Sequence, residues 1–264
     1  MKKILFVLFS MLCFIKIINS QDLRVINNDA FQRGEKIAYK VFYDSFVTGH
    51  VNAGEASLEI EKEDKIIANR STMHVIGLGK TKGLFNFFFK VNDRYETYID
   101  EKAIAPLLFI RRVSEGNYKK SQDVTFNHFK NIAISNTKTA KVTSYVQDII
   151  STFYYARTIN VKNVKIGDEF PVSFFLDDSV YTTKIIFDGR EDVKIDLGTF
   201  KCLRFKPMVL SGKIFSQPYP MTLWVSDDEN LVPILAESGI LVGSVKMELI
   251  KYSNLKNPLK SQIN

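Results

Sequence analysis

From residue 35 onwards, short apolar and aromatic runs alternate with turns, a pattern typical of an all-β protein. In the segment EASLEIE at 55–61, Ala56, Leu58 and Ile60 share one face and polar residues occupy the other. One face therefore meets a core and the other meets water. The pattern predicts strands at 36–47, 51–62, 65–77, 90–99, 106–113, 117–126, 131–136, 169–176, 180–188, 191–197, 199–210, 213–225, 231–239 and 242–251.

The predicted strands are separated by turns rich in Asp, Asn and Gly. Asp188-Gly189-Arg190 is one such predicted turn. The carboxylate clusters at 177–178 and 227–229 also fall at turns, where Asp side chains bond to nearby backbone amides. A turn role is therefore favoured over a calcium site or a glycosidase pair at these positions.

Two segments depart from the strand pattern. The aromatic run LFNFFFK at 84–90 fits either a short helix or a strand. In the segment near 144–157, apolar residues recur at three- and four-residue steps, which predicts a helix. Ser144 would cap this helix, with Gln147 completing a capping box. The helix would lie between two strand-rich halves of one β domain spanning residues 21–253.

The N-terminus has the layout of a secretory signal peptide. Lys2 and Lys3 precede an apolar run, and the small residue Ser20 precedes a polar segment, so we predict a signal peptide at 1–20. Cys13 follows the bulky Leu12, which argues against attachment of a lipid. The protein is predicted to be exported, with the periplasm favoured over release outside the cell.

Composition narrows the classes of function further. Loss of the signal peptide leaves Cys202 as the single cysteine, so no intramolecular disulfide is expected and Cys202 is predicted to be a small buried side chain. The net charge falls from +7 to +4 with both signs interleaved, which does not suggest nucleic-acid binding. A second run of about 18 apolar residues is absent from the sequence, and the strands show no continuous lipid-facing band, so the chain is not predicted to be integral to the membrane. The polar tail at 254–264 is expected to be disordered.

The sequence contains no recognisable catalytic or metal-binding motif. Gly77 and Gly79 miss the spacing of a phosphate loop, and neither a nucleophile elbow nor an HExxH motif is present. The three histidines are far apart in sequence, so a zinc site is disfavoured against a structural role. Asp93, Glu96 and Asp100 are the carboxylates hardest to assign to turns, and a surface pair with Arg94 is the favoured explanation. We therefore predict no catalytic residues, no metal and no cofactor.

Aromatic content is the unusual feature, with 21 Phe, 11 Tyr and one Trp. Most are expected in the core, and an entirely ordinary core remains the alternative to any binding site. A curved sheet around one helix would also create an apolar cavity. The residues predicted to line it are Phe87, Phe89, Phe153, Tyr154 and Trp224.

An ordered set of segments over nearly the whole mature chain resembles the bacterial exported proteins grouped as domain of unknown function 3108. The segments are GEKIAYKVFYDSFVTGHVNAGEASLEI at 34–60, VNDRYETYID at 91–100, the pattern from Pro106 to Tyr118, QDIISTFYYAR at 147–157, GTFKCLRFKP at 198–207 and the late LWVSDDENLVPI and GSVKMEL. The resemblance implies an envelope location and no settled activity. It also implies a fold similar to the lipoprotein-carrier type: an incomplete antiparallel barrel, strongly curved, with one or two short helices in its mouth.

Three functions remain open at this level. The favoured one is a non-enzymatic carrier that buries an apolar small molecule, an acyl chain or the lipid anchor of a lipoprotein, with the helix as a lid. The alternative is a structural or assembly factor that binds an envelope protein or a glycan through a sheet edge or exposed aromatics. An enzyme acting on polysaccharide is the least favoured, because it needs facing carboxylates or an activated nucleophile.

Overall fold

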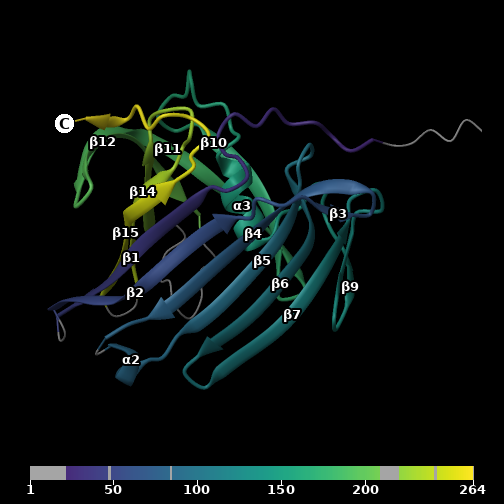
Figure 1. Ribbon diagram of the computed structural model, residues 1–264, viewed down its shortest axis with the longest axis horizontal. Helices are drawn as coiled ribbons and strands as arrows, with labels where there is room; N and C mark the ends of the chain where they lie inside the picture. The colour runs from purple at the N-terminus through teal and green to yellow at the C-terminus, as the bar shows by residue number, and fades with distance from the viewer. Residues whose placement is uncertain (1–21, 47–48, 84, 209–219, 241–242, 264) are drawn as a thin grey trace, which may run out of the picture.

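The alternating segments pair into one curved, mainly antiparallel sheet that does not close into a barrel (Figure 1). The computed structural model describes residues 22–46, 49–83, 85–208, 220–240 and 243–263. The fold class expected from the sequence is confirmed. The predicted signal peptide at 1–20 lies outside the described residues.

The described residues of the first half of the chain form nine strands and the short helix α2 (Phe85–Phe88). The strands are β1 (Lys36–Ser45), β2 (Gly49–Ile60), β3 (Lys65–Ile67), β4 (Arg70–Thr81), β5 (Asn92–Asp100), β6 (Ala105–Glu115), β7 (Tyr118–Asn127), β8 (Ile132–Ser135) and β9 (Thr139–Lys141).

The second half begins with the helix α3 (Ile149–Ala156), and its described part continues through seven strands. They are β10 (Glu169–Leu176), β11 (Ser179–Ile195), β12 (Gly198–Pro207), β13 (Met221–Ser226), β14 (Pro233–Gly239), β15 (Ser244–Ser253) and β16 (Gln262–Ile263). None of the described helices has the length and hydropathy needed to cross a bilayer.

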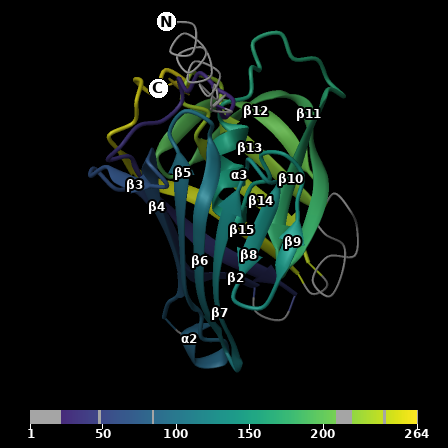
Figure 2. The same ribbon diagram turned by 90° about the vertical axis from the view of Figure 1, so that its right-hand side faces the viewer.

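The two halves meet at the centre of the sheet, where β1 pairs with β15. The strand order is β10-β11-β12-β13-β14-β15-β1-β2-β4-β5-β6-β7-β8-β9, with β3 on β4 and β16 on β12. Neighbours in the sheet are mostly neighbours in sequence, as expected for strands joined by hairpins. The edges are therefore β9 and β10, and α3 lies in the concavity between the halves (Figure 2).

Two strand predictions change in the structure. The predicted strands 180–188 and 191–197 form the single strand β11, because Gly189 adopts φ 132° at a register shift instead of reversing the chain. The predicted strand 65–77 is divided between β3 and β4 by a tight turn at Ala68 and Asn69, both with positive φ. Residues 213–219 of another predicted strand lie outside the described residues.

The helix predicted near 144–157 is present but begins later than expected. Tyr145 has φ 57°, and the backbone of Gln147 bonds to β10, with its N–H donating to the carbonyl oxygen of Ser173 at 2.9 Å. Asp148, rather than Ser144, is the N-cap, and it forms a capping box with Ser151. Within the segment 84–90, undecided from its sequence, residues Phe85–Phe88 form the short helix α2.

The sheet alternates between a face that packs on α3 and an outer face. A Cβ atom at Gly77 would lie 3.1 Å from Cδ1 of Ile150, so α3 approaches β4 closely at this glycine. The next residue, Leu78, is exposed on the outer face. The apolar residues packed with Tyr154 of α3 come from both the N-terminal segment and the sheet: Ala30, Phe31, Ile60, Met73, Val75, Ile99 and Ile104.

The C-terminal segment is ordered against the sheet, contrary to the disorder expected at 254–264. Leu255 and Leu259 pack on the apolar cluster that includes Phe200 and Leu249. Beyond them, Thr199 and Phe200 of β12 pair with β16. The C-terminal segment is polar in composition because exposed residues alternate with these half-buried leucines.

Candidate functional site

An apolar cavity of about 210 Å³ lies between α3 and the C-terminal half of the sheet. On the sheet side it is lined by apolar residues of β10 to β13 and the following loop: Phe170, Ile185, Phe205, Pro207, Leu223, Val225 and Leu231. On the helix side, Ile149, Phe153 and Ala156 form one stripe at four- and three-residue steps.

Strand register brings the sheet side of this wall together. Phe170 is paired with Ile185, which is paired in turn with Pro207, and Phe205 is paired with Leu223. These residues occupy alternate positions on four adjacent strands, so their side chains point to the same face. The rings of Phe170 and Phe205 also meet edge to face, with centroids 6.4 Å apart.

A polar groove of about 810 Å³ adjoins the cavity, and the two share Arg157, Ile159, Val161 and Leu231 in their linings. Charges of both signs line the groove: Lys162, Arg190 and Lys260 with Asp29, Asp227, Asp228 and Glu229. The site therefore combines an apolar compartment with a polar one of mixed charge.

Arg157 lies where the two compartments meet and is almost fully buried. It binds Glu35 through both terminal nitrogens of the guanidinium group, with Nη1 2.5 Å from Oε1 and Nη2 2.9 Å from Oε2. Burial opposes the guanidinium charge, but the neighbouring Glu35 outweighs it and raises the pKa of Arg157. Arg157 also donates to the carbonyl oxygens of Ala30 and Asn230, at 3.1 and 2.9 Å.

Of the five aromatics predicted to line a cavity, the structure places Phe153 in this wall. The adjacent Tyr154 is fully buried on another side of α3, where its ring contacts Phe31 edge to face at 4.9 Å. Phe87 and Phe89 are 88% and 46% exposed and do not line the cavity, since they lie in and just after α2, which is well separated from α3 (Figure 1). The five residues therefore do not converge on one cavity.

Trp224 lies on β13 between Leu223 and Val225, which both line the cavity, so alternation directs its side chain away. Its indole N–H donates to Glu191 at 2.5 Å. The sequence showed the aromatic content of this strand but not which of its alternating positions faces inward. The helical periodicity that located α3 would have indicated Ile149 and Ala156 alongside Phe153.

The three carboxylates left open in sequence separate in the structure. Asp100 pairs with Arg70 and accepts the backbone N–H groups of Lys102 and Ala103 at 3.0 and 2.7 Å. Glu96 accepts hydrogen bonds from Arg94 Nε and His74 Nε2, both at 2.7 Å. Both carboxylates therefore have structural partners.

Asp93 is buried and accepts the backbone N–H of Ser114 at 2.9 Å. Its side chain also forms a hydrogen bond with the carboxyl group of Glu115. Burial, together with this bond between the two carboxyl groups, raises the pKa of Glu115. Carboxyl groups in hydrogen-bond contact are closer than the roughly 5 Å that a retaining glycosidase requires. This pair therefore does not fit glycoside cleavage.

The remaining side chains that could bind a metal or act as a nucleophile do not form a site within the described residues. Among the described residues, no three His, Cys, Asp or Glu side chains gather as a metal site would need. His128 is buried, and its ring lies parallel to those of Phe126 and Tyr145. Burial raises the pKa of Cys202 to about 12, so its thiol stays protonated, as expected for a structural side chain.

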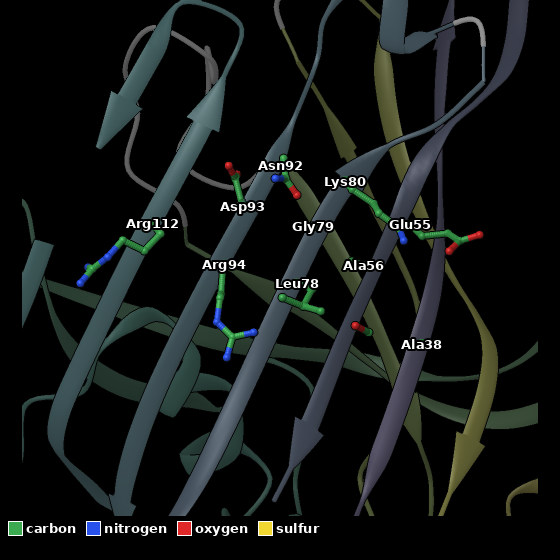
Figure 3. A pocket seen from close by; sticks show the side chains of 11 residues that line it. Ala38, Glu55, Ala56, Leu78, Gly79, Lys80, Asn92, Asp93, Arg94 and Arg112 are labelled. Atoms are coloured by element: carbon green, nitrogen blue, oxygen red, sulfur yellow. The ribbon is translucent and has the colours of Figure 1, made fainter. Parts of the chain in front are cut away.

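A second depression, of about 420 Å³, lies on β1 to β6 (Figure 3). Register aligns Ala38, Ser57, Leu78, Arg94 and Arg112 in one row across five strands, on the outer face. Arg94 and Arg112 are both exposed, and Lys80 lies nearby in the same depression. This surface carries Glu55 and Asp93 as well as the three basic side chains, and it is separate from the cavity beneath α3.

A family model described as a protein of unknown function, DUF3108, matches residues 38–250. A comparison with curated proteins finds no match. Among solved structures, the β-barrel-like protein of the domain of unknown function DUF1849 from Brucella abortus aligns with a TM-score of 0.53 at 11% identity, covering 88% of this chain and 98% of that chain. This likeness shows the fold alone.

Two further solved structures align over a similar length but with lower TM-scores. A candidate lipoprotein from Parabacteroides distasonis gives 0.35 at 12% identity, covering 88% of this chain and 100% of that chain. A candidate exported protein with a YmcC-like fold from Bacteroides fragilis gives 0.33 at 11% identity, covering 87% and 100%. Scores this low do not relate the folds.

Proposed function

We propose that this chain, which belongs to the DUF3108 family, is an exported, non-enzymatic carrier of a single-chain amphiphile in the periplasm. The hydrocarbon tail would occupy the cavity beneath α3, and the head group would occupy the adjoining polar groove. The observation that carries the proposal is the contact between an apolar compartment and a polar one, which share four lining residues.

The size of the cavity favours one chain over a multi-chain anchor. An apolar cavity of about 150 Å³ admits benzene, and ligand pockets usually measure roughly 300–1,000 Å³. At about 210 Å³, the cavity accepts several carbons of one chain before any wall must move. Burial of each CH₂ group contributes about 0.8 kcal/mol.

The charges in the groove favour a zwitterionic or neutral polar head group. Arg190 pairs with Asp227 and Lys260 with Glu229, at 3.2 and 2.8 Å. These pairs leave no large excess of positive or negative charge in the groove, and Glu35 already neutralises the charge of Arg157. A head group carrying both charges could exchange with these exposed pairs at small cost.

In this proposal α3 acts as a fixed wall rather than the lid suggested by its sequence. Its first residue is preceded by Asp148, whose carboxylate accepts the hydroxyl of the buried Thr97 at 2.6 Å. Its last residue is followed by Arg157 with its buried ion pair. Because breaking a buried pair costs about 3–5 kcal/mol, movement of α3 is a costly route of entry. The groove offers a route that leaves both ends in place.

The assembly-factor alternative, in which a protein or glycan binds an open sheet edge, has less support. The edge strand β9 is three residues long, and β10 exchanges two backbone hydrogen bonds with Gln147. Short or covered edges discourage strand addition. For the polysaccharide enzyme, the carboxylates Asp93 and Glu115 lie too close together to act as a catalytic pair, as described above.

The test is to fill the cavity. Ala156→Leu adds bulk on the α3 side of the wall, and Ala38→Leu adds the same atoms on the outer face as a matched control. Binding of lysophosphatidylcholine, kept below its micellar concentration, is measured by calorimetry. We expect Ala156→Leu to weaken binding about tenfold or more and Ala38→Leu to leave it unchanged.

Native mass spectrometry of the protein purified from its own envelope provides an independent measurement. A stoichiometric single-chain lipid on the wild type, lost in Ala156→Leu, supports the carrier. Equal binding by wild type and Ala156→Leu, or no binding by the wild type, rules out the cavity as the site.

A further inference from the structure

An exposed aromatic tip projects from the connection between β4 and β5, at the end of the long strands remote from β3 (Figures 1 and 2). It consists of Phe87, Phe88 and Phe89, which are 88%, 80% and 46% exposed. Phe46, just after β1, is also fully exposed. Clustered apolar side chains that a protein holds in water mark a surface that meets a partner.

The aromatic tip is held in place by its neighbours. Phe85 packs against Tyr43 of β1, with ring centroids 5.8 Å apart. The N–H of Gly116, in the β6–β7 turn, donates to the carbonyl oxygen of Lys90 at 2.8 Å. Phe87 and Phe88 therefore cannot fold back into the core without breaking these contacts, and they face outward as a fixed feature.

Several basic side chains lie near the aromatic tip, together with Glu115 at the end of β6, which lies opposite Val91. The sequence contains no acidic residue between Asp64 and Asp93, a segment that includes Lys80, Lys82 and Lys90. Glu55, on the neighbouring strand β2, is paired with Lys82. Lys90 and Lys119 are both exposed, and within the described residues neither forms an ion pair.

Further basic side chains lie along the outer face of the sheet. Arg94 and Arg112 lie there in one row with Leu78 (Figure 3), and Lys80 lies two residues further along β4, towards the tip. Both arginines are paired, with Glu96 and Asp123, so their charges are partly balanced. The unpaired lysines therefore provide most of the attraction near the tip.

We propose that the aromatic tip inserts into the interface of a bilayer that contains anionic lipid. Aromatic rings are enriched at the level of lipid head groups, and flanking Lys and Arg side chains are attracted to anionic head groups. The tip is convex, which suits penetration of a fluid surface, whereas a protein partner would need a matching concavity. The long strands would then stand end-on to the membrane.

The test is sedimentation with vesicles, using the exported form that begins at Gln21, so that the apolar N-terminal segment cannot contribute. Vesicles of phosphatidylglycerol and phosphatidylethanolamine are compared with vesicles of phosphatidylcholine. We expect binding to the anionic vesicles that weakens with salt. The double variant Phe87→Ser/Phe88→Ser should bind about tenfold more weakly or worse.

The matched control is Ile66→Ser/Ile166→Ser, which removes two side chains that are 63% and 75% exposed outside the tip. Its binding should equal that of the wild type. Equal binding by the tip variant, no binding by the wild type, or equal binding to phosphatidylcholine overturns the proposal. Ala156→Leu should bind vesicles normally, so failure of the carrier proposal is distinguishable from failure of this one.

Discussion

Asp148 illustrates how one buried residue organises the helix beneath the sheet. Its Oδ1 accepts the N–H groups of Ile150 and Ser151, both at 2.8 Å, and its Oδ2 accepts the hydroxyl of Thr97 at 2.6 Å. The carboxylate has no contact with water, and this burial raises its pKa to about 6 despite the three hydrogen bonds. The charged form is therefore disfavoured in the folded protein.

A raised pKa for an acid predicts stability that falls as pH rises. The contribution of Asp148 should be fully present below its ordinary pKa of 3.8 and lost as the pH rises through about 6. Asp148→Asn keeps a good N-cap without the charge. As the pH rises from 4 to 7, we expect the free energy of unfolding of this variant to increase relative to that of the wild type by up to roughly 3 kcal/mol. Urea denaturation at several pH values measures the difference, and a difference independent of pH would contradict the prediction.

The position of this cap could have been found in the sequence but was hidden by a competing pattern. Val146 continues the apolar periodicity towards the N-terminus and favours an early start at Ser144. In the fold, Val146 is fully buried ahead of the helix, and Gln147 is drawn into pairing with β10. A tertiary contact therefore overrides a local signal. The burial of Cys202, which needs only local alternation, was predicted correctly.

At the scale of elements, the C-terminal segment closes an apolar cluster that the strands leave open. Leu255 and Leu259 pack on it, and the N–H of Ser261 donates to Asp228 at 3.0 Å. The N–H of Asn257 donates to the side-chain oxygen of Asn230, also at 3.0 Å. These contacts tie the end of the chain to the β13–β14 loop.

Truncation after Ser253 is therefore expected to destabilise the protein by at least about 3 kcal/mol, since it removes two packed leucines and their polar contacts. Thermal and urea denaturation measure the loss. Lys260→Ala, which changes only an exposed ion pair of the same segment, should leave the unfolding midpoint essentially unchanged. An unchanged midpoint after truncation would show that the segment does not contribute.

Most elements could be predicted because period-two alternation is a local property. The errors fall where one residue changes the geometry of a strand, as at Gly189, which is equally compatible with a turn and with a bulge. β9 and β16 were missed because strands of three and two residues carry too little pattern. Their pairing depends on partners elsewhere in the chain.

At the scale of the whole molecule, the Glu35–Arg157 pair joins three distant parts of the chain. Glu35 precedes β1, Arg157 ends α3, and Asn230 belongs to the β13–β14 loop. Both charged side chains are buried, so each depends on the other for its neutralisation. The pair also borders the proposed ligand site.

Removal of one partner should be far more damaging than removal of both. Glu35→Gln leaves the guanidinium buried without its counter-charge and is expected to lower the free energy of unfolding by about 3–5 kcal/mol. The double variant Glu35→Leu/Arg157→Met should recover a large part of this loss. Urea denaturation of the single variants Glu35→Leu and Arg157→Met and of the double variant gives the coupling energy. A double variant as unstable as the sum of the singles would show that the charges do not compensate each other.

The curved sheet and its central helix were predictable at this scale, but the composition of the cavity was not. Whether Leu223 or Trp224 faces inward depends on register, and register shifts occur on β1, β5, β11 and β13. One extra residue reverses the face of every side chain beyond it. Aromatic abundance alone therefore predicted a cavity without locating it.

The pairing of β1 with β15 has a consequence for how the chain acquires its structure. β1 can complete its pairing only when β15 is available, because nearly the whole chain separates Lys36 from its partner Ser253. Contacts between such distant residues form slowly, since a large loop must close first. A chain that emerges N-terminus first would keep one edge of β1 uncovered until its final segment arrives. Folding before the C-terminal strands are available is thereby limited by the topology itself.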